Sequence, residues 1–459
     1  MSFLPAVSLF SGSGIGNVGL CVAGITFVVA NELLEDRAAL LALNLPEAEV
    51  IPGDIWEKLD QIIERTGARL QKEKVSELFL LLATPPCQGM SANGLGKLLN
   101  NARKGLRPKL DPRNRLIIPA LKFAQVHRPR WVVFENVVQM KNTLIEDEDR
   151  QLTKIVDLIP RYLGDEYVGR YYEVEFADYG LPQRRQRLIT VYTRDNEAIE
   201  SYRNNVELIP EPTHDSKGRL GRHPWVTVRK ALTEFPPLDG KGPESASDLV
   251  MPFHRVPVLD PKKYEWISHT SEGCSAFDNQ CVNPKCRFQN NPTHGAVRGK
   301  DGINRAKQST PLYCVKCGTL LPRPYVAESN GKLRIMSGYT SAYKRMPWDM
   351  PASTLTRNLS YPSSDHTLHP SENRVLSIAE ALKLQSISNY EYKWGPVRVR
   401  GKQYVVVPDT LITDCIGESV PPIFTELLGR HLLQVATSKA HDLYLQPKQL
   451  AFTVMREET

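Results

Sequence analysis

Residues 78–88 read Leu-Phe-Leu-Leu-Leu-Ala-Thr-Pro-Pro-Cys-Gln. Their first five residues form an uninterrupted apolar run of strand length, which is typical of a strand buried on both faces of a parallel sheet. Pro85 and Pro86 cannot continue this strand, and they stiffen the turn at its carboxyl end. In open α/β sheets this edge is where ligands bind. The stretch therefore predicts an α/β fold that exposes the Cys87 thiol at the sheet edge, against the alternative of one more buried cysteine.

The composition is that of an ordinary globular chain. Its 459 residues suggest two or three domains, and 41% are apolar while 24% are charged. No segment approaches the ~20 apolar residues that span a membrane, and the amino terminus lacks the basic region of a signal peptide. Eight cysteines in a chain of this length indicate free thiols or metal ligands rather than a disulfide framework. We therefore expect a cytosolic protein that has no membrane partner.

Positive charge is concentrated directly after the cysteine. Residues 97–115 hold seven lysines and arginines against a single acid, Asp111, whereas the whole chain has a net charge of only +7. Such a run is most often a solvated loop. Its position just beyond Cys87 favours a loop that contacts phosphates near a reactive centre.

The amino-terminal residues predict a nucleotide-type site. Residues 7–10 form a short apolar strand, and Ser-Gly-Ser-Gly-Ile-Gly at 11–16 leads from it into a helical pattern. Asn17 stands where a dinucleotide site has its third glycine, which argues against NAD. Glu32 ends a second strand 20 residues after Gly12, a position from which a carboxylate can hold ribose hydroxyls. Asp54 closes a third strand in the same way, so the strand ends describe an adenosine pocket.

A second acid is expected to face Cys87. Residues 130–134 read as a buried strand that ends at Glu135, and the carboxyl ends of parallel strands meet over one cleft. The alternative is a surface acid that happens to follow a strand. Because Cys87 and Glu135 both follow strands of the same predicted sheet, we favour an active site that contains both.

Two arginines are predicted on one face of a later strand. Residues 171–176 alternate as a strand, and Gln-Arg-Arg-Gln-Arg at 183–187 enters another strand at 188–192. Arg185 and Arg187 share a face because side chains alternate along a strand. Adjacent guanidinium groups at a sheet edge need anions or carbonyl oxygens as partners.

The βα rhythm ends near residue 193. Residues 193–373 are rich in proline, glycine and asparagine and carry five of the eight cysteines. Two close pairs, Cys281 with Cys286 and Cys314 with Cys317, have the spacing of a structural zinc site with four thiolates. Cys274 could replace Cys281, and reduced thiols without a metal are the alternative.

Order returns near the carboxyl terminus. Residues 374–385 predict an amphipathic helix, with Ser377 and Glu380 as a capping box. Ile-Gly-Glu-Ser-Val-Pro-Pro at 416–422 then precedes a helix that runs from 423 to about 435.

In this order, the pieces resemble the DNA cytosine-5 methyltransferase family over most of the chain outside about 193–350. The similar motifs are the cofactor loop at 10–14, Pro-Cys-Gln at 86–88, Glu-Asn-Val at 135–137, Gln183 with Arg185 and Arg187, the helix at 374–385, and the closing motif at 417–422. Two residues depart from the family pattern: Ser8 replaces an acid, and Glu418 replaces an asparagine. The four cysteines are not a general family feature.

The resemblance implies a doubly wound, Rossmann-like methyltransferase fold with an irregular inserted target-recognition domain. The catalytic domain would cover 1–192 and be completed by 410–440, and the recognition domain would cover 193–409 with a zinc-binding insert at 270–330. The implied enzyme flips a cytosine out of duplex DNA and adds the Cys87 thiolate to carbon 6. It then transfers a methyl group from S-adenosylmethionine to carbon 5. Glu135 would contact ring N3 and the amine, while Arg185 and Arg187 would grip O2.

Further site residues follow from the same resemblance. Contacts to S-adenosylmethionine are expected from Phe10, Ser11, Gly12, Ser13, Gly14, Ile15, Glu32, Asp54, Ile55, Pro86, Leu116, Ser419 and Val420. Contacts to DNA are expected from Gln88, Ser91, Asn93, Arg103, Lys104, Arg107 and Gln183. The implied partners are double-stranded DNA, bound by a monomer in the bacterial nucleoid, and cognate restriction or defence proteins.

Three rival functions are weighed against this one. A transfer-RNA cytosine-5 methyltransferase is the nearest, but that branch usually has a Cys-Phe-Thr tripeptide in its recognition half, and this chain has none. A zinc-ribbon DNA-binding protein with an inactive enzyme body is disfavoured by intact Cys87, Glu135 and Arg185. A nicotinamide oxidoreductase is disfavoured by Asn17 and by the Pro-Pro-Cys sequence.

Overall fold

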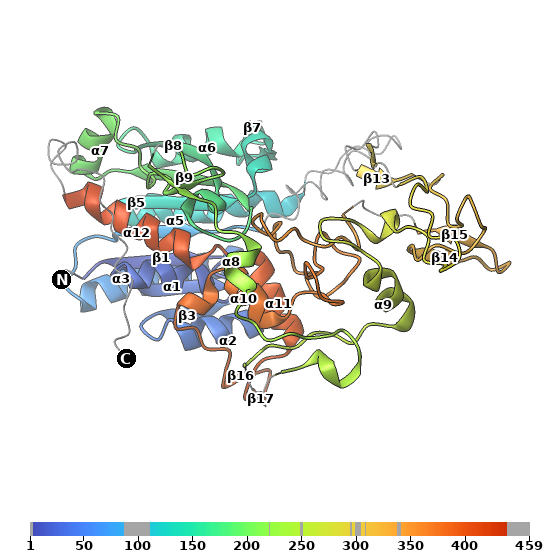
Figure 1. The fold of residues 1–459 in the computed structure, drawn as a ribbon. Helices are drawn as coiled ribbons and strands as arrows, with labels where there is room; N and C mark the ends of the chain where they lie inside the picture. Colours follow the sequence, from blue (N-terminus) through green and yellow to red (C-terminus); the bar gives the residue numbers. More distant parts are fainter. Residues whose placement is uncertain are drawn as a thin grey trace.

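The computed structural model describes residues 3–86, 111–219, 221–247, 251–293, 296–298, 304–307, 309–336 and 341–437. Its centre is a seven-stranded sheet in the order β3-β2-β1-β4-β5-β9-β8 (Figure 1). The strands span β1 Pro5–Leu9, β2 Thr26–Glu32, β3 Glu49–Pro52, β4 Leu80–Ala83, β5 Trp131–Asn136, β8 Val168–Glu175 and β9 Gln186–Thr193.

The strand order separates this sheet from a dinucleotide-binding one. Strands β3, β2, β1, β4 and β5 are mutually parallel, whereas β9 runs antiparallel to both of its neighbours, β5 and β8. A dinucleotide-binding sheet has the all-parallel order 3-2-1-4-5-6. The inserted antiparallel strand therefore excludes the nicotinamide oxidoreductase fold. The order reverses between β1 and β4, so a ligand crevice is expected at the carboxyl ends of these two strands.

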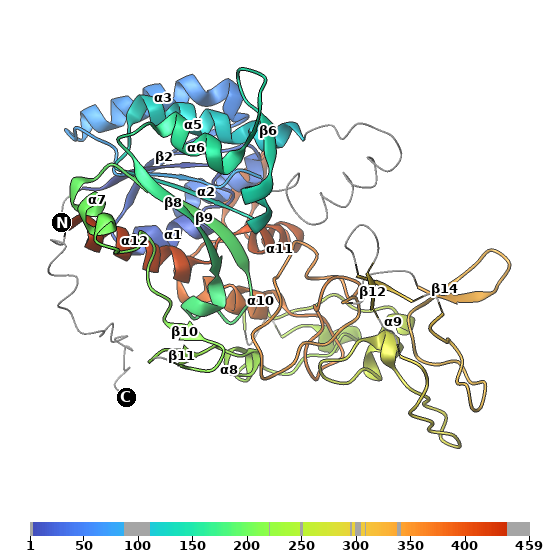
Figure 2. The same ribbon diagram turned by 90° about the horizontal axis from the view of Figure 1, so that it is seen from above.

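Helices cover both faces of the sheet, as Figure 2 shows. On one face the core contains side chains of α3, α5 and α6, and on the other it contains those of α1, α2, α7 and α12. The helices span α1 Ile15–Val22, α2 Glu35–Asn44, α3 Ile55–Lys72, α5 Ile117–His127, α6 Ile155–Leu163, α7 Asn196–Arg203 and α12 Pro422–Thr437. This doubly wound arrangement is the fold class that the sequence predicts.

Strand β4 confirms the interpretation of the apolar run. Leu81 and Ala83 pack in the core on one side of the sheet, while Leu80 and Leu82 pack on the other. The strand begins at Leu80, two residues later than the apolar run. The first two residues of the run, Leu78 and Phe79, are also buried. Burial on both faces explains why the run shows no polar alternation.

The region between β9 and the last helices is largely irregular. It contains the short helices α8 Val228–Leu232, α9 Pro261–Ser268, α10 Ile378–Leu384 and α11 Asp409–Glu418. Its paired strands are β10 His214–Asp215 with β11 His223–Pro224, β12 Ala296–Arg298 with β13 Asn304–Ala306, β14 Tyr325–Ala327 with β15 Leu333–Ile335, and β16 Val397–Val399 with β17 Lys402–Tyr404. In the described part of the chain, no helix is both long and apolar enough to cross a membrane.

Helix α10 carries the predicted capping box. Ser377 Oγ accepts a hydrogen bond from the Glu380 backbone N–H, and the Glu380 carboxylate accepts one from the Ser377 backbone N–H. The helix is shorter than predicted because the residues before Ser377 are extended. Arg374, at the predicted start, instead turns its buried guanidinium onto the Glu380 carboxylate at 2.6 Å.

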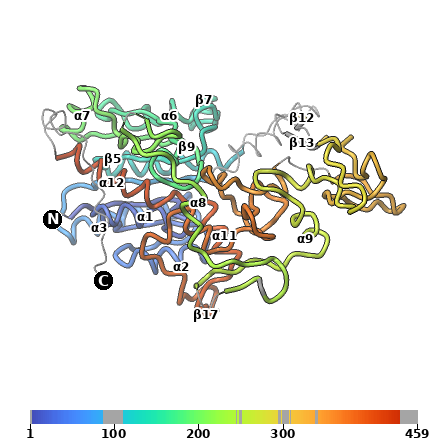
Figure 3. Tube along the Cα trace, in the orientation of Figure 1, coloured from blue at the N-terminus to red at the C-terminus, as the bar shows by residue number. Residues whose placement is uncertain are grey.

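The last helix of the chain lies against the first, as the trace in Figure 3 shows. Gly19 of α1 stands at the closest approach. A Cβ atom at this position would lie 2.2 Å from the Pro422 carbonyl oxygen and 2.3 Å from Thr425 Oγ1. The absence of a side chain at Gly19 therefore allows α12 to complete the core beneath β1.

We expect Gly19→Ala to destabilise the protein by about 1–3 kcal/mol, because backbone atoms of α12 would have to move. Gly67→Ala in α3 is the matched control, since its Cβ would find no atom closer than 3.9 Å. That change should be neutral or stabilise the helix by up to about 1 kcal/mol. Thermal unfolding of both variants measures the difference. Equal melting temperatures would contradict the close packing of α1 on α12.

Candidate active site

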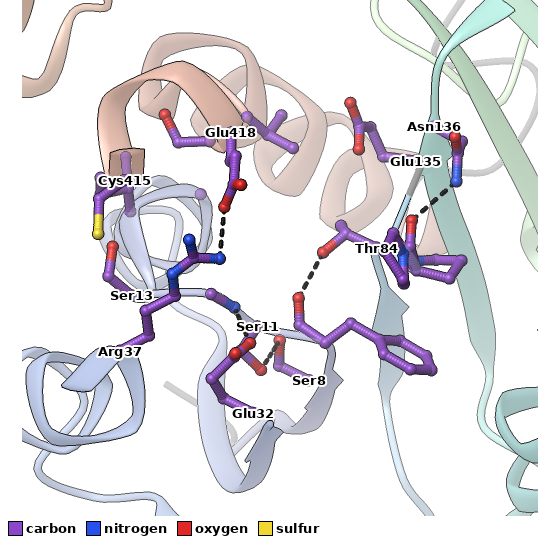
Figure 4. Close-up of a pocket in the computed structure, with 18 of the residues that line it drawn as sticks. Ser8, Ser11, Ser13, Glu32, Arg37, Thr84, Glu135, Asn136, Cys415 and Glu418 are labelled. Atoms are coloured by element: carbon purple, nitrogen blue, oxygen red, sulfur yellow. Dashed lines mark hydrogen bonds and ion pairs between the residues drawn. The ribbon is translucent and has the colours of Figure 1, made fainter. Parts of the chain in front are cut away.

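A cavity of about 880 Å³ opens at the carboxyl ends of β1, β4 and β5 (Figure 4). It is lined by the turn after β1, the ends of β2 and β4, Glu135, Arg187 and the Ser419–Val420 segment. Every residue that the resemblance assigns to the cofactor lines it except Gly14. Gly14 lies behind the turn at φ 83°, where it begins α1 in a conformation that favours glycine.

Backbone and side-chain hydrogen bonds fix the turn after β1. Ser11 Oγ donates to Ser8 Oγ at 2.8 Å, so Ser8 supports the turn where the family has an acid. The Gly12 N–H donates to Glu32 Oε2 at 2.9 Å, and Thr84 Oγ1 donates to the Phe10 carbonyl at 2.8 Å. The turn is thereby tied to the ends of both neighbouring strands.

The cavity suits an adenosine group. Each carboxylate oxygen of Glu32 accepts one backbone N–H, and its remaining lone pairs are available for ribose hydroxyls. Burial raises the pKa of this carboxyl. Leu33 and Trp56 line the cavity although they are 60% and 45% exposed. Such uncovered apolar faces fit a flat aromatic ring. Asp54 caps α3 by accepting the Trp56 N–H, so it holds the tryptophan backbone in place.

Glu135 faces the cavity beside Arg187. The Arg187 Nε lies 2.9 Å from Glu135 Oε1, and both side chains are largely buried. Burial raises the pKa of Glu135, while the nearby Arg187 and Arg185 guanidinium groups oppose this shift. Asn136 Nδ2 donates to the Pro85 carbonyl at 2.9 Å. This bond fixes the proline turn next to the acid, as the sequence predicts for two strands that end over one cleft.

Arg185 has other partners than the predicted base. It is 1% exposed, and its guanidinium donates to the carbonyls of Leu355, Gly417 and Ser419 at 2.9–3.0 Å. The prediction that Arg185 grips the cytosine O2 is therefore not supported by this geometry, because both terminal nitrogens of its guanidinium donate hydrogen bonds to backbone carbonyls. Its observed role is to position the wall of the cavity.

Gln183 also has partners within the protein. It is fully buried, its Nε2 donates to Gln385 Oε1 at 2.7 Å, and its Oε1 accepts the Leu355 N–H at 2.9 Å. In this structure Gln183 therefore links the segment before β9 to the irregular region. Its contact with DNA stays a prediction.

The proposed nucleophile lies outside the described residues. So do the other predicted DNA contacts, which are Gln88, Ser91, Asn93, Arg103, Lys104 and Arg107. Pro86, the residue before Cys87, lines the cavity. The roles of Cys87 and of the basic loop therefore stay predictions.

Glu418 enters an ion-pair cluster at the cavity wall. Its carboxylate lies 2.5 Å from Arg37 and 3.4 Å from Arg357, and both arginines also face Asp414 (Figure 4 shows the pair with Arg37). Arg37, Arg357 and Glu418 all line the cavity. The family's asparagine is thus replaced here by a charge that has partners on α2 and on the 353–358 segment.

The four predicted metal ligands come together far from this cavity. All four Sγ atoms of Cys281, Cys286, Cys314 and Cys317 lie within 4.8 Å of one another. The Cys281–Cys317 and Cys286–Cys314 sulfur distances are 3.6 and 3.9 Å. A tetrahedral Zn²⁺ with bonds of about 2.3 Å requires sulfur separations of about 3.8 Å. Cys274 is not part of the cluster, so the alternative in which it replaces Cys281 is not supported.

Sequence reasoning missed several residues of the cavity. Arg37, Trp56 and Arg357 line the cavity and stand outside the motifs named above. Trp56 had a signal, because an aromatic residue two positions after a strand-end acid, in the first turn of the next helix, lies near whatever that acid binds. Arg357 had no such signal in the sequence, since it belongs to the irregular region, whose fold brings it to the cavity.

The parallel-rich sheet with one antiparallel strand, and a nucleoside-shaped cavity at its switch point, define an α/β enzyme of the S-adenosylmethionine-dependent methyltransferase class. Residues 4–434 match the model of the C-5 cytosine-specific DNA methylase family. The chain therefore belongs to this family, whose members transfer a methyl group to carbon 5 of cytosine in DNA.

Two type II methyltransferases agree with this assignment. The chain is 27% identical over 443 residues to the type II methyltransferase M1.HgaI of Avibacterium volantium, covering 94% of this chain and 98% of that protein. It is 30% identical over 243 residues to M.AquIA of Picosynechococcus, covering 50% of this chain and 88% of that one. The structure of the Entamoeba histolytica methyltransferase EhMeth is 12% identical, covers 95% of this chain and all of that one, and has a TM-score of 0.48.

We expect Glu418→Gln to weaken binding of S-adenosylmethionine more than binding of S-adenosylhomocysteine, by roughly three- to fivefold. The two ligands differ by the methyl group and its sulfonium charge, and loss of the carboxylate leaves Arg37 and Arg357 less compensated. Calorimetric titration of both ligands measures the ratio. Glu391→Gln, an exposed acid outside the cavity, is the control of equal charge. An equal loss for both ligands would mean that Glu418 acts through shape alone.

Proposed function

We propose that the protein methylates cytosine in duplex DNA, with Glu135, Arg187 and Cys87 acting on a base that has left the helix. One observation carries this assignment: a single cavity joins the turn after β1 to the Glu135–Arg187 pair. The two reaction partners, a nucleoside cofactor and a base, can therefore meet inside one enclosure. A base within a duplex could not enter it, so the nucleotide must be extruded at a cost of a few kcal/mol.

Glu135 would supply the proton that the reaction needs at the ring. Addition of a thiolate to carbon 6 places negative charge on the base, and a proton at N3 removes it. Burial favours the protonated carboxyl, which donates a hydrogen bond to N3, while Arg187 holds the group in orientation. Arg187 Nε pairs with Glu135 and its Nη1 donates to the Gln186 carbonyl at 2.8 Å, so Nη2 would be the donor to the base O2, a role that the resemblance shares between two arginines.

Cys87 would be the nucleophile at the end of the proline turn. A thiol with an ordinary pKa near 8.5 is mostly protonated at neutral pH, so positive charge nearby must stabilise the thiolate. The seven basic residues of 97–115 are one source of that charge. Bound S-adenosylmethionine would supply the methyl group as an electrophile. The basic loop would close over the opened strand.

The biological setting follows the relatives. The two relatives named above are type II methyltransferases, and we propose that this chain acts in a restriction-modification system, in a bacterial cytoplasm. A target-recognition domain at about 193–409 and monomeric action on DNA stay predictions.

We also propose one structural Zn²⁺ on the four cysteines. The sulfur geometry supports it, and so does the small local core, which besides these cysteines contains Leu321 and Phe288. So little apolar area would hardly order the segment by itself, whereas metal binding contributes directly to folding. Four protein ligands leave no open coordination position, so the ion would have no catalytic part.

The catalytic assignment predicts that Glu135→Gln lowers the rate of methyl transfer by roughly 10²–10⁴-fold, because an amide cannot donate a proton to N3. The wild-type rate should also fall as pH rises through the raised pKa of Glu135, since the protonated form is the active one. The Glu135→Gln variant should not show this fall in rate with rising pH. Single-turnover methylation of duplex DNA provides the rate, and bisulfite sequencing provides the target.

Cys87→Ser serves as the inactive reference in the same assay. It should abolish transfer while S-adenosylmethionine binding stays within a few-fold of the wild type. Near-normal turnover in the serine variant would refute the nucleophile, and an unchanged rate in Glu135→Gln would refute the acid.

The metal assignment predicts about one zinc per chain in metal analysis of the purified protein. Cys281→Ser and Cys317→Ser should each lose the metal, whereas Cys274→Ser should retain it because that thiol stands apart from the cluster. Chelation should impair sequence-specific DNA binding and leave S-adenosylmethionine binding intact. Metal-free protein that binds and methylates its site normally would contradict the proposal.

A further inference from the structure

Residues 279–324, which we call the cysteine arm, carry the whole positive excess of the chain. They hold eight lysines and arginines and one acid, Asp301, which gives +7. The net charge of all 459 residues is also +7, so the remainder of the chain is neutral overall. Four thiolates around one Zn²⁺ would lower the arm to +5, which is still strongly positive. A charge this concentrated indicates a polyanionic partner.

Three of these cations surround the cysteine cluster. Lys285 and Arg287 flank Cys286, and Lys316 lies between Cys314 and Cys317. Their side chains are exposed. Because the four sulfur atoms lie within 4.8 Å of one another, the three cations start from a common small surface.

Within the part of the chain that the structure describes, the cations of this surface form no ion pair with an acid. Among the described residues of the arm there is no aspartate or glutamate, and Lys285, Arg287 and Lys316 form no ion pair there. Elsewhere exposed arginines are commonly paired, as Arg229 is with Asp349 at 2.7 Å and Arg65 with Glu49 at 3.3 Å. The arm therefore keeps its charge available for an external ligand.

The arm is anchored from within. The buried guanidinium of Arg323 donates to the carbonyls of Asn279, Pro292 and Pro311 at 2.8–2.9 Å, so it joins three segments behind the cysteines. Asn279 Nδ2 in turn donates to the carbonyls of Trp266 and Pro322, each at 2.7 Å. A surface fixed in this way presents its cations without paying the ordering entropy of a flexible tail.

The arm lies away from the catalytic cavity. Strand β14, which follows the arm in sequence, lies at the end of the molecule opposite α7 in both ribbon views, and α9, which precedes the arm, lies on the same side of the molecule but nearer the body (Figures 1 and 2). A contact made there cannot read the flipped cytosine. It would fall on nucleic acid outside the target site.

We propose that the cysteine arm is a second DNA-binding surface, which holds the phosphates of duplex DNA flanking the target site. This inference rests on the proposed function, because an enzyme seated on duplex DNA places its projecting arm beside a continuous polyanion. Lysine and arginine contacts to phosphate position a protein without reading bases. The contact therefore adds affinity for long DNA of any flanking sequence. A duplex partner is favoured over single strands because single-strand surfaces carry stacked aromatic platforms, and Tyr313 is the only exposed aromatic side chain among the described residues of the arm.

Two duplexes with the same target site separate the arm from the cavity. The short one ends about six base pairs beyond the site, and the long one continues for about 20 base pairs on each side. The wild type should bind the long duplex more tightly, and the slope of log affinity against log salt should be steeper on it. The combined variant Lys285→Gln, Arg287→Gln and Lys316→Gln should lose this advantage, with a slope shallower by up to about 2.7, since each phosphate contact contributes about 0.9.

Three controls make the result specific. The charge-preserving variant Lys285→Arg, Arg287→Lys and Lys316→Arg should keep the advantage. Lys72→Gln, Lys74→Gln and Arg203→Gln remove the same charge from the far body and should also keep it. Zinc content and single-turnover methylation of saturating short duplex should match the wild type in all three variants.

Several outcomes would overturn the inference. They are equal wild-type affinity for both duplexes, an unchanged slope in the glutamine variant, or an equal loss on both duplexes. If the glutamine variant loses zinc, Lys307→Gln, at an exposed arm lysine seven residues before Cys314 in the sequence, replaces it and should lower the slope by about 0.9. If the wild type methylates neither duplex, the proposed function is refuted. The second DNA-binding surface is then tested by the difference in affinity between the long and the short duplex alone.

Discussion

The buried guanidinium of Arg185 joins three parts of the chain that are far apart in sequence. From the start of β9 it donates to a carbonyl in the 353–358 segment and to two carbonyls at the end of α11. A buried arginine without partners would be very costly, and each orphaned carbonyl would cost about 1–3 kcal/mol. Undocking of the sheet, the irregular region or the last helices would therefore leave buried polar groups without partners, so Arg185 stabilises their docking. Residues of all three parts line the cavity.

The same device holds the irregular region itself. Backbone groups outside helices and sheets still need partners when they are buried. Arg345 donates to the carbonyls of Ile267, Thr270 and His369, and Arg323 does the same within the cysteine arm. A guanidinium offers five N–H donors in a fixed plane, which suits converging carbonyls better than an ammonium would. Buried arginines thus replace much of the hydrogen bonding that regular secondary structure would provide.

Charge in the cavity is arranged in two paired sets. Glu135 with Arg187 lies where the base would enter, and Glu418 with Arg37 and Arg357 lies at the cofactor side. Pairing keeps each acid oriented and limits the cost of its burial. Residues on α2, α11 and the 353–358 segment meet in the second set, so the irregular region contributes to the wall of the cavity there.

The sequence by itself determined the fold class, the positions of the first strands along the chain, the strand-end acids Glu32 and Glu135, and the grouping of the four cysteines. These features are local: an unbroken apolar run, a proline turn, and Cys pairs at fixed spacing each constrain a few adjacent residues. Only the tertiary structure decided what Arg185 and Gln183 do, because a polar side chain looks the same in sequence whether it meets DNA or a distant carbonyl. It also decided that Arg37 and Arg357 reach the cavity and that Cys274 stands apart. Such roles depend on contacts between segments that lie up to hundreds of residues apart in the sequence. The irregular segments have no sequence periodicity from which these contacts could be inferred.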